Sequence, residues 1–371
     1  MTPQNSTLMK LGVPREIQDN RVALVPATLP KLKDLGLEIL IERDAGAGAM
    51  YDNVDFEAHA TLVDRKTLLA QADMILSINP LPEEELKSLK PETVVVALFQ
   101  PYVDASITEK LRSWKLRGLS FDMIPRTTLA QSMDVLSSMA AVAGYKAVLE
   151  AARLLPRYFP MMITAAGSIP PSKVLVLGAG VAGLQAIATA RRLGAMVEAF
   201  DTRQAAKEEV ESLGAKFVEV AGAKDDKGAG GYAVEQSEEF LQRQRTEVQA
   251  RAAKADVIIT TAQVRGRKAP ILLPKETVEK MKHGSVVVDL AASTGGNCEL
   301  TKDNEIINHN GVLIVGNSNL AALMPQDASV LFSNNALNFI KILIKKGELD
   351  LDMNNEIIRG AYFTAEPVAA Q

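Results

Sequence analysis

The chain has 371 residues, of which 47% are hydrophobic and 23% are charged, and it carries a formal net charge of −4. This length is sufficient for two domains, and the composition is that of an ordinary globular protein rather than a disordered or fibrous one. The mixed charges form no basic stripe for nucleic acid, and the single cysteine, Cys298, excludes an internal disulfide framework.

Short apolar, β-branched runs alternate with helical patterns along the chain. In the N-terminal third, strands are predicted at residues 8–13, 38–42, 74–78, 93–98 and 119–122, and helices at 26–35, 83–89 and 105–115. This alternation predicts parallel sheets with helices on both faces. A long helix is then predicted from about residue 130 to Leu155, because Pro156 and Pro160 prevent it from continuing.

The segment TAAGSIPPSK has the composition of a connector, and a second series of strands follows it. These strands are predicted at residues 173–177, 196–201, 216–220, 256–262, 285–291 and 312–315, with a helix at 235–254. The amphipathic segment LFSNNALNFIKILIKK near the C-terminus is expected to form a helix that returns to the first domain. The sequence therefore predicts two Rossmann-like α/β domains, one of residues 1–136 with 325–371 and one of residues 137–324.

The strongest local signal is the segment KVLVLGAGVAGLQAIATARRLGAMVEAFD, in which an apolar strand ends in a glycine-rich turn and passes into a helix. Gly178 permits the tight turn, Gly180 allows a pyrophosphate to approach the backbone, and Gly183 allows close packing of helix and strand. Asp201 ends the next strand, where a carboxylate accepts hydrogen bonds from an adenosine ribose and disfavours a 2′-phosphate. The pattern predicts NAD(H) binding, although Arg203 could instead meet a phosphate. The alternative is a glycine-rich turn without a ligand.

Residues 221–232, AGAKDDKGAGGY, combine four glycines with four charged side chains and end in Tyr232. This composition predicts a loop that becomes ordered when its ligand binds, with the tyrosine ring folding over the nucleotide. The alternative is a plain surface excursion ahead of the next helix.

Few residues of the chain are suited to proton transfer in a dehydrogenase. The three histidines are His59, His283 and His309, so none lies near the glycine-rich turn in sequence. Cys298 has no neighbouring base to form a thiolate, and no Cys/His spacing indicates a metal site. Hydride transfer between two nicotinamide rings needs no acid or base, and requires only that the rings be oriented and water excluded.

The segments RTTLAQSMDVLSSMAAVAGYKAV, FPMMITAAGSIPPSKVLVLGAGVAGLQAIATARRLGA, GAGGYA and VVVDLAASTGGNC closely resemble the NAD(H)-binding subunit of proton-translocating nicotinamide nucleotide transhydrogenase. The likeness extends over about residues 8–340, and the fold is shared with alanine dehydrogenase. The resemblance implies two Rossmann-like domains linked by long helices, with the cofactor in the interdomain cleft. It also implies a homodimer that works with an NADP(H)-binding subunit and a membrane-spanning proton-channel subunit.

The resemblance also implies roles for individual residues. The residues expected to act on the nicotinamide are Arg126, Asp134 and Ser137, with Gln131 facing the partner's NADP(H) and Thr127, Thr128 and Leu129 lining the pocket through their backbone. The residues expected to hold the rest of NAD(H) are Gly178, Gly180, Val181, Gly183, Asp201, Thr202, Arg203, Gly231, Tyr232, Gln244 and Gln263. A structural ion pair between Arg126 and Asp134, capping the long helix, is the alternative explanation for those two side chains.

Two other functions remain possible at this point. Alanine dehydrogenases carry a lysine in the segment that matches ILSINP, a histidine in the one that matches VALFQP, and an aspartate where this chain has Ser293. All three are absent here, and only their substrate arginine has a match, Arg21. A non-catalytic NAD-sensing module is the third hypothesis. The N-terminus lacks the pattern of a signal peptide and no apolar run reaches the ~18 residues of a membrane span, so we expect a cytoplasmic chain, held at the inner face of the membrane through partner subunits.

Overall fold

The computed structural model describes residues 8–219, 238–263 and 266–366. The chain divides into two compact units, which are described separately below. Unit 1 contains Met1–Met139 and Ala322–Gln371, and unit 2 contains Ala140–Ala321. The first boundary falls inside helix α6 (Val135–Leu154) and the second inside the short 3-10 helix η6 (Leu320–Leu323). The loop at 221–232, with Gly231 and Tyr232, lies outside the described residues.

Unit 1 contains a six-stranded parallel sheet in the order β3-β2-β1-β4-β5-β6. Its strands are β1 (Met9–Val13), β2 (Leu37–Glu42), β3 (Thr61–Val63), β4 (Met74–Leu76), β5 (Val94–Ala97) and β6 (Arg117–Ser120). Its helices are α1 (Leu29–Lys33), α2 (Asn53–Glu57), α3 (Arg65–Gln71), α4 (Glu83–Ser88), α5 (Ser106–Ser113), α11 (Pro325–Leu343) and α12 (Glu356–Ala361). The order reverses between β1 and β4, as in a Rossmann fold.

The short elements of unit 1 are four 3-10 helices and a small hairpin. They are η1 (Pro26–Thr28), η2 (Ala47–Ala49), η3 (Phe121–Met123), η4 (Thr128–Met133), and the strands β16 (Ile344–Lys345) and β17 (Glu348–Leu349). Five predicted strands are found, but strand β3 and helices α2 and α3 were not predicted. Each of these three is short and half-exposed at the surface of the unit, which gives a weak hydrophobic pattern.

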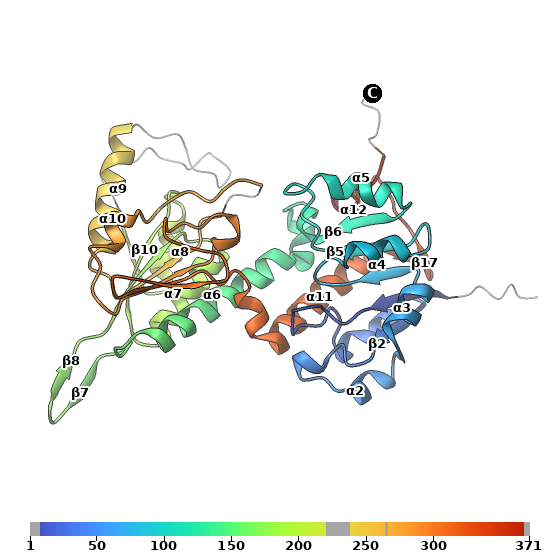
Figure 1. Cartoon of the computed structure of the whole chain (residues 1–371), viewed down its shortest axis with the longest axis horizontal. Helices are drawn as coiled ribbons and strands as arrows, with labels where there is room; N and C mark the ends of the chain where they lie inside the picture. The colour runs from blue at the N-terminus through green and yellow to red at the C-terminus, as the bar shows by residue number, and fades with distance from the viewer. Residues whose placement is uncertain (1–7, 220–237, 264–265, 367–371) are drawn as a thin grey trace, which may run out of the picture. The chain divides into compact units, whose positions relative to one another are not determined.

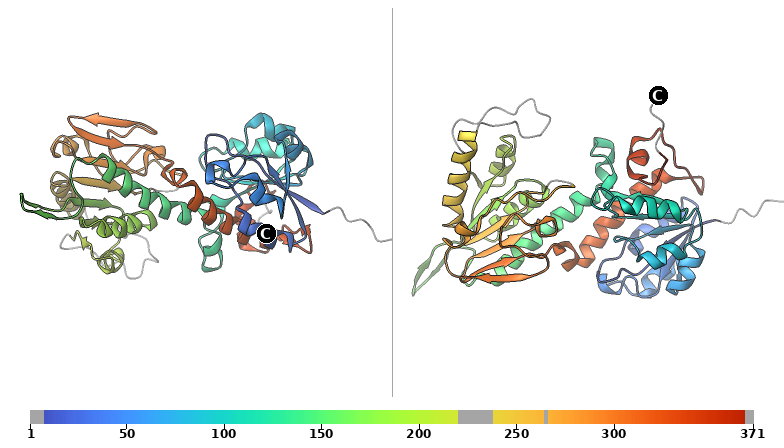
Figure 2. Two further views of the ribbon diagram at one scale, coloured as in Figure 1. Left: turned by 90° about the horizontal axis from the view of Figure 1, so that it is seen from below. Right: turned by 45° about the horizontal axis from the view of Figure 1, so that its top comes forward.

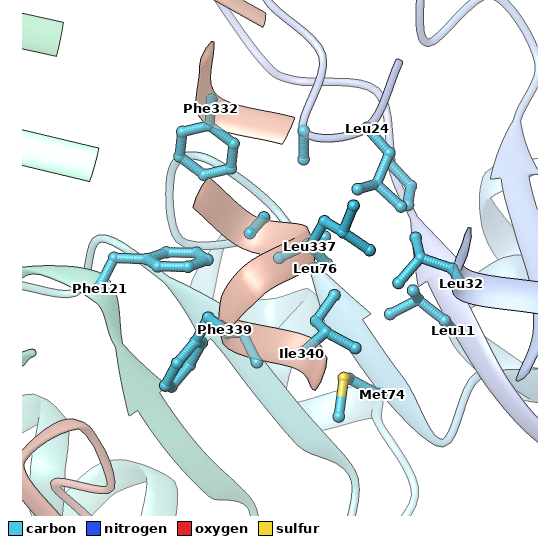
Figure 3. Close-up of a cluster of buried hydrophobic side chains, with 14 of the residues drawn as sticks. Leu11, Leu24, Leu32, Met74, Leu76, Phe121, Phe332, Leu337, Phe339 and Ile340 are labelled. Atoms are coloured by element: carbon cyan, nitrogen blue, oxygen red, sulfur yellow. The ribbon is translucent and has the colours of Figure 1, made fainter. Parts of the chain in front are cut away.

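Helix α11 confirms the prediction that the C-terminal segment returns to the first domain. Its apolar face, including Phe332, Phe339 and Ile340, packs among the buried side chains of the unit 1 strands (Figure 3). Ser329 and Ser333 of this helix accept hydrogen bonds from the backbone N–H groups of Val22 and Val25, at 2.9 and 3.1 Å. The helix therefore also satisfies backbone donors that would otherwise be buried without partners.

Unit 2 contains a seven-stranded sheet in the order β11-β10-β9-β12-β13-β15-β14, parallel except for β14. Its strands are β9 (Lys173–Leu177), β10 (Met196–Phe200), β11 (Lys216–Phe217), β12 (Val257–Thr260), β13 (Val286–Asp289), β14 (Ile306–His309) and β15 (Val312–Val315). Its other elements are α7 (Val181–Arg192), α8 (Ala206–Ser212), α9 (Glu238–Ala252), α10 (Lys275–Val278) and η5 (Ala292–Thr294). Both units are therefore Rossmann-like, as predicted.

Two local predictions were wrong. The connector TAAGSIPPSK contributes to a hairpin of β7 (Met162–Thr164) and β8 (Gly167–Ile169), which projects from the rest of unit 2 (Figures 1 and 2). Gly167, with φ of +130°, supplies a backbone conformation in the turn that other residues rarely adopt. The long helix also begins later than expected, at Val135, because the segment before it forms the 3-10 helix η4.

By length and composition, α6 is the one helix of the described residues that could cross a membrane. Its residues Ala147, Val148 and Ala151 are fully buried in the core of unit 2. A Cβ atom on Gly144 of this helix would lie 2.1 Å from the backbone oxygen of Ala182 in α7, so the two helices are in direct backbone contact. We therefore interpret α6 as a core helix.

Candidate functional site

The turn between β9 and α7 has the close approach that the glycine pattern predicts. Gly178 has φ of +106°, and a Cβ atom there would lie 2.5 Å from the hydroxyl oxygen of Thr261. A Cβ atom on Gly183 would lie 1.9 Å from the backbone oxygen of Gly178, so only glycine lets the helix approach the strand this closely. Gly180, at the helix N-cap, has open space where a side chain would stand.

The start of α7 is consequently suited to an anion. No side chain caps the helix, whose 12 residues begin at the half-exposed Val181. The first N–H groups of a helix carry partial positive charge and bind phosphates readily. The open space at Gly180 lets such a group reach the backbone. These features fit the pyrophosphate of a dinucleotide.

Hydrogen bonds from neighbouring strands hold this turn in place. The N–H of Gly178 donates to the oxygen of Phe200 at 2.8 Å, which continues the ladder between β9 and β10. Thr261, directly after β12, donates its hydroxyl to the oxygen of Gly178 at 3.1 Å. The N–H of Ala179 donates to the carboxylate of Asp201 at 2.8 Å. The turn is therefore attached to both strands that flank β9.

Asp201 lies at the end of β10 and is largely buried beside the turn. Its carboxylate accepts hydrogen bonds from the backbone N–H and the side-chain Nε of Arg203, at 2.8 and 3.0 Å. Burial alone would raise the pKa of the Asp201 carboxyl, but the hydrogen bonds and charge of Arg203 outweigh it and the pKa is lowered. Asp201 is therefore ionised at neutral pH, and its charge is partly balanced by a guanidinium whose side chain is 35% exposed. Thr202 between them is exposed.

The carboxyl end of β13 carries an aspartate that the sequence pattern did not single out. Asp289 is fully buried, and its carboxylate accepts four hydrogen bonds from donors on three segments. The donors are the hydroxyls of Thr260 and Thr301, at 2.9 and 2.6 Å, and the backbone N–H groups of Ala291 and Cys298, at 3.0 and 2.9 Å. An ionised carboxylate is acceptor-only, so this arrangement satisfies it. The useful signal was the aspartate directly after the apolar run VVV.

Asn297 and Gln263 extend this network along the same edge of the sheet. The buried Asn297 side chain accepts from the N–H of Ala262 at 2.9 Å and donates back to the oxygen of Ala262 at 2.8 Å. Gln263 is exposed and donates its amide to the oxygen of Leu290 at 2.7 Å. The loops after β12 and β13 are therefore joined to each other. Gln244, in contrast, lies half-buried on α9.

Cys298 agrees with the structural role predicted for it. The thiol is fully buried, and burial raises its pKa to about 11. The reactive thiolate form is therefore scarce at neutral pH. In the described ranges, no group of three His, Cys, Asp or Glu side chains is placed to hold a metal ion.

In unit 1, the predicted nicotinamide residues surround the 3-10 helix η4. Arg126, Thr128, Leu129 and Gln131 are exposed, and Leu129 is 77% exposed despite being apolar. The hydroxyl of Thr127 is buried without a hydrogen-bond partner among the described residues. An unpaired buried hydroxyl is costly, so this atom is available to a ligand or a water molecule.

Asp134 and Ser137 form the N-terminal cap of α6. The Asp134 carboxylate accepts from the backbone N–H of Ser137 at 2.9 Å and from its hydroxyl at 2.6 Å. The ion pair between Arg126 and Asp134, considered from the sequence, is not found among the ion pairs of the described residues, because Ser137 occupies the carboxylate. The loop itself is attached to α11, since Asn335 and Asn338 donate their amides to the oxygen of Ser132 at 2.8 and 3.2 Å.

Two protein-family models match the chain. The alanine dehydrogenase/PNT N-terminal domain matches residues 12–143, and the alanine dehydrogenase/PNT C-terminal domain matches residues 147–368. The chain belongs to the alanine dehydrogenase/PNT family.

Among its relatives, an NAD(P) transhydrogenase subunit alpha chain of Rhodospirillum rubrum is 42% identical over 96% of this chain and 97% of its own length. The NAD(P) transhydrogenase subunit alpha of Haemophilus influenzae is 40% identical over 95% of this chain and 70% of its own length. The crystal structure of the transhydrogenase from Sinorhizobium meliloti is 39% identical, with a TM-score of 0.87 over 95% of this chain and 97% of that one. An L-alanine dehydrogenase structure is 27% identical, with a TM-score of 0.73 over 90% of this chain and 89% of that one.

We predict that Asp289→Asn lowers the free energy of unfolding of unit 2 by about 2–3 kcal/mol, because an amide NH₂ would face donors that now bond to a carboxylate. It should also speed the reaction of Cys298 with a thiol reagent by roughly tenfold or more, since local opening becomes easier. Urea denaturation and timed thiol labelling measure the two effects. The control is Asp303→Asn, an exposed position on the same segment of chain. Unchanged labelling of Asp289→Asn would contradict the role assigned to this carboxylate.

Proposed function

We propose that this chain is the NAD(H)-binding subunit of a proton-translocating transhydrogenase, which passes a hydride from NADH to NADP⁺ held by a partner subunit. Several observations support the proposal. Relatives named as transhydrogenase alpha subunits match over nearly the whole chain, at about 40% identity. The unit 2 turn also has the geometry that a dinucleotide pyrophosphate requires.

The observation that carries the proposal is the β9–α7 turn. Gly178 and Gly183 bring strand and helix into contact, and Gly180 leaves the helix N-terminus open. We propose that the pyrophosphate binds at Gly180 and Val181, and that Asp201, Thr202 and Arg203 surround the adenosine ribose. The proposed nucleotide-binding set also includes Gln263 and, outside the described residues, Gly231 and Tyr232. Gln244 has the weakest claim to membership.

The proposed reaction needs orientation rather than acid–base catalysis. Hydride transfer from one nicotinamide C4 to another releases no proton, so the histidine-poor sequence is no obstacle. In the proposal, Arg126, Asp134 and Ser137 hold the nicotinamide carboxamide and ribose, and the backbone of Thr127 to Leu129 lines the ring. The exposed Gln131 faces the nucleotide of the partner. The cap that Asp134 makes with Ser137 would fix both side chains before the ligand arrives.

The same proposal defines the assembly. The chain would work as a homodimer, together with an NADP(H)-binding subunit and a membrane-spanning subunit that conducts protons. It would lie in the cytoplasm, held at the inner face of the membrane through those partners. The exposed Leu129, beside Gln131, is consistent with a surface that a partner covers.

We predict that the chain binds NADH more tightly than NADPH and that Asp201→Asn reduces this preference by about tenfold. Loss of the carboxylate removes the repulsion of a 2′-phosphate and releases the Arg203 guanidinium to meet it. Calorimetric titration with both nucleotides measures the preference. Glu198→Gln removes a carboxylate from the same strand, where it pairs with Arg251, and should leave the preference unchanged. Equal affinity of the unmodified chain for NADH and NADPH would overturn the assignment of the nucleotide.

We predict that Gln131→Asn leaves NADH affinity within about twofold but lowers the rate of hydride transfer by roughly 10²-fold, because ~1 Å of misplacement can cost that much. Single-turnover transfer from NADH to NADP⁺, after mixing with an NADP(H)-binding subunit, measures the rate. Gln71→Asn is the matched control, since this exposed glutamine precedes β4 and lies at the opposite edge of the same sheet. A normal transfer rate in Gln131→Asn would remove this residue from the reaction.

A further inference from the structure

The carboxyl end of the unit 1 sheet contains a buried group of charged side chains that the proposed reaction does not use. It lies where the loop after β1 meets the loop after β4, at the point where the strand order reverses. Ligands of open α/β sheets bind in the crevice at such a point. A hollow of about 240 Å³ opens there, beside Glu16 and Asn79. In place of a glycine-rich turn, unit 1 has the charged segment PREIQDNR.

The centre of this group is an ion pair between Arg21 and Asp19. Their side chains are only 5% and 2% exposed. The Asp19 carboxylate accepts from Nε of Arg21 at 3.0 Å and also from its terminal Nη2, so the guanidinium grips the carboxylate from one side. Bidentate contact of this kind is how arginine recognises carboxylate ligands.

Asn79, from the loop after β4, completes the contacts of the carboxylate. Its amide nitrogen donates to Asp19 at 3.1 Å and to a second carboxylate, that of Glu16, at 3.0 Å. Glu16 also accepts the backbone N–H groups of Ile78 and Asn79, at 2.6 and 3.1 Å. A guanidinium, an amide and two backbone N–H groups therefore surround a pair of carboxylates.

The two carboxylates are held differently. Burial raises the pKa of Glu16, and the nearby charge of Asp19 adds to this. Burial also acts to raise the pKa of Asp19, but the hydrogen bonds and charge of Arg21 outweigh it and lower the pKa. Asp19 is thus the carboxylate that balances the charge of the guanidinium.

We propose that Arg21 and Asn79 form a latent binding site for a small carboxylate, such as formate or a 2-oxo acid, and that Asp19 occupies this site as an internal ligand. Asp19 lies on the same loop as Arg21, so it competes with any free acid at a very high effective concentration. The site is built from buried donors that match a carboxylate, and the chain fills it itself. A small carboxylic acid is therefore excluded from the crevice of unit 1.

The consequence for substrate choice rests on the proposed function. If the chain donates a hydride to a nucleotide, the closed crevice removes small 2-oxo acids as competing acceptors. Asp19 is then a specificity-determining residue, although it need not touch either nucleotide. The site itself can be tested without any nucleotide, so its failure would leave the proposed hydride transfer untouched.

The test is chemical rescue of Asp19→Ala by formate, which replaces the deleted carboxylate atom for atom. The melting temperature of this variant should rise by roughly 2–4 °C once formate exceeds its Kd about tenfold, compared with chloride at equal ionic strength. The unmodified chain should not respond, because Asp19 fills the site. If the variant does not fold in chloride, the yield of folded protein on dilution from urea into formate replaces the melting temperature as the measurement.

The matched control is the double variant Asp19→Ala/Arg21→Met, which lacks the guanidinium and should not respond to formate. A response of the single variant alone supports the latent site. An identical melting temperature in formate and chloride, or the same failure to fold in both, would overturn the proposal. An equal response of the unmodified chain or the double variant would do so as well, because formate would then act elsewhere.

Discussion

The close approach of α7 to the end of β9 is the constraint on which the rest of unit 2 depends. A Cβ atom on Gly183 would lie 1.9 Å from the oxygen of Gly178, so any other residue would push the helix away from the strand. The same helix is contacted from its other side at Gly144 of α6, again through a glycine. Because both contacts are between backbones, the start of α7 is held rigidly. Its N–H groups can then point at a fixed position, as binding a pyrophosphate requires.

Buried carboxylates stabilise the carboxyl ends of the strands in both units, and their partners distinguish their roles. Asp289 is satisfied by hydroxyls and backbone N–H groups, so it joins loops and has no exposed oxygen to offer. Asp19 is balanced by a buried guanidinium and closes its crevice. Asp201 is paired with an arginine that is still 35% exposed, which leaves its surroundings accessible to a ribose. These three environments illustrate how neighbours, rather than residue type, set the role of a carboxylate.

The central strands and the glycine-rich turn could be predicted because their signals are local. Strand β9 was predicted with its observed bounds, and the glycines follow directly from it. The edge strands β3 and β14 were missed because they are short and at most half-buried, so they lack a clear apolar period. The roles of Asp289 and Asp19 could not be predicted, since their partners depend on how distant loops meet. The sequence pointed to Asp134 and Ser137 as neighbours on a helix, but only the structure shows that one caps the other.

The central claim is that NADH on this chain gives its hydride directly to NADP⁺ on a partner, with no proton exchanged. The most direct test uses NADH carrying deuterium in the transferred position at C4, mixed with the complex of this chain and an NADP(H)-binding subunit in ordinary water. The account predicts that the deuterium is recovered at C4 of NADPH without dilution by solvent hydrogen. Solvent hydrogen at that position would contradict it, as would oxidation of the NADH by a small 2-oxo acid in the absence of NADP⁺.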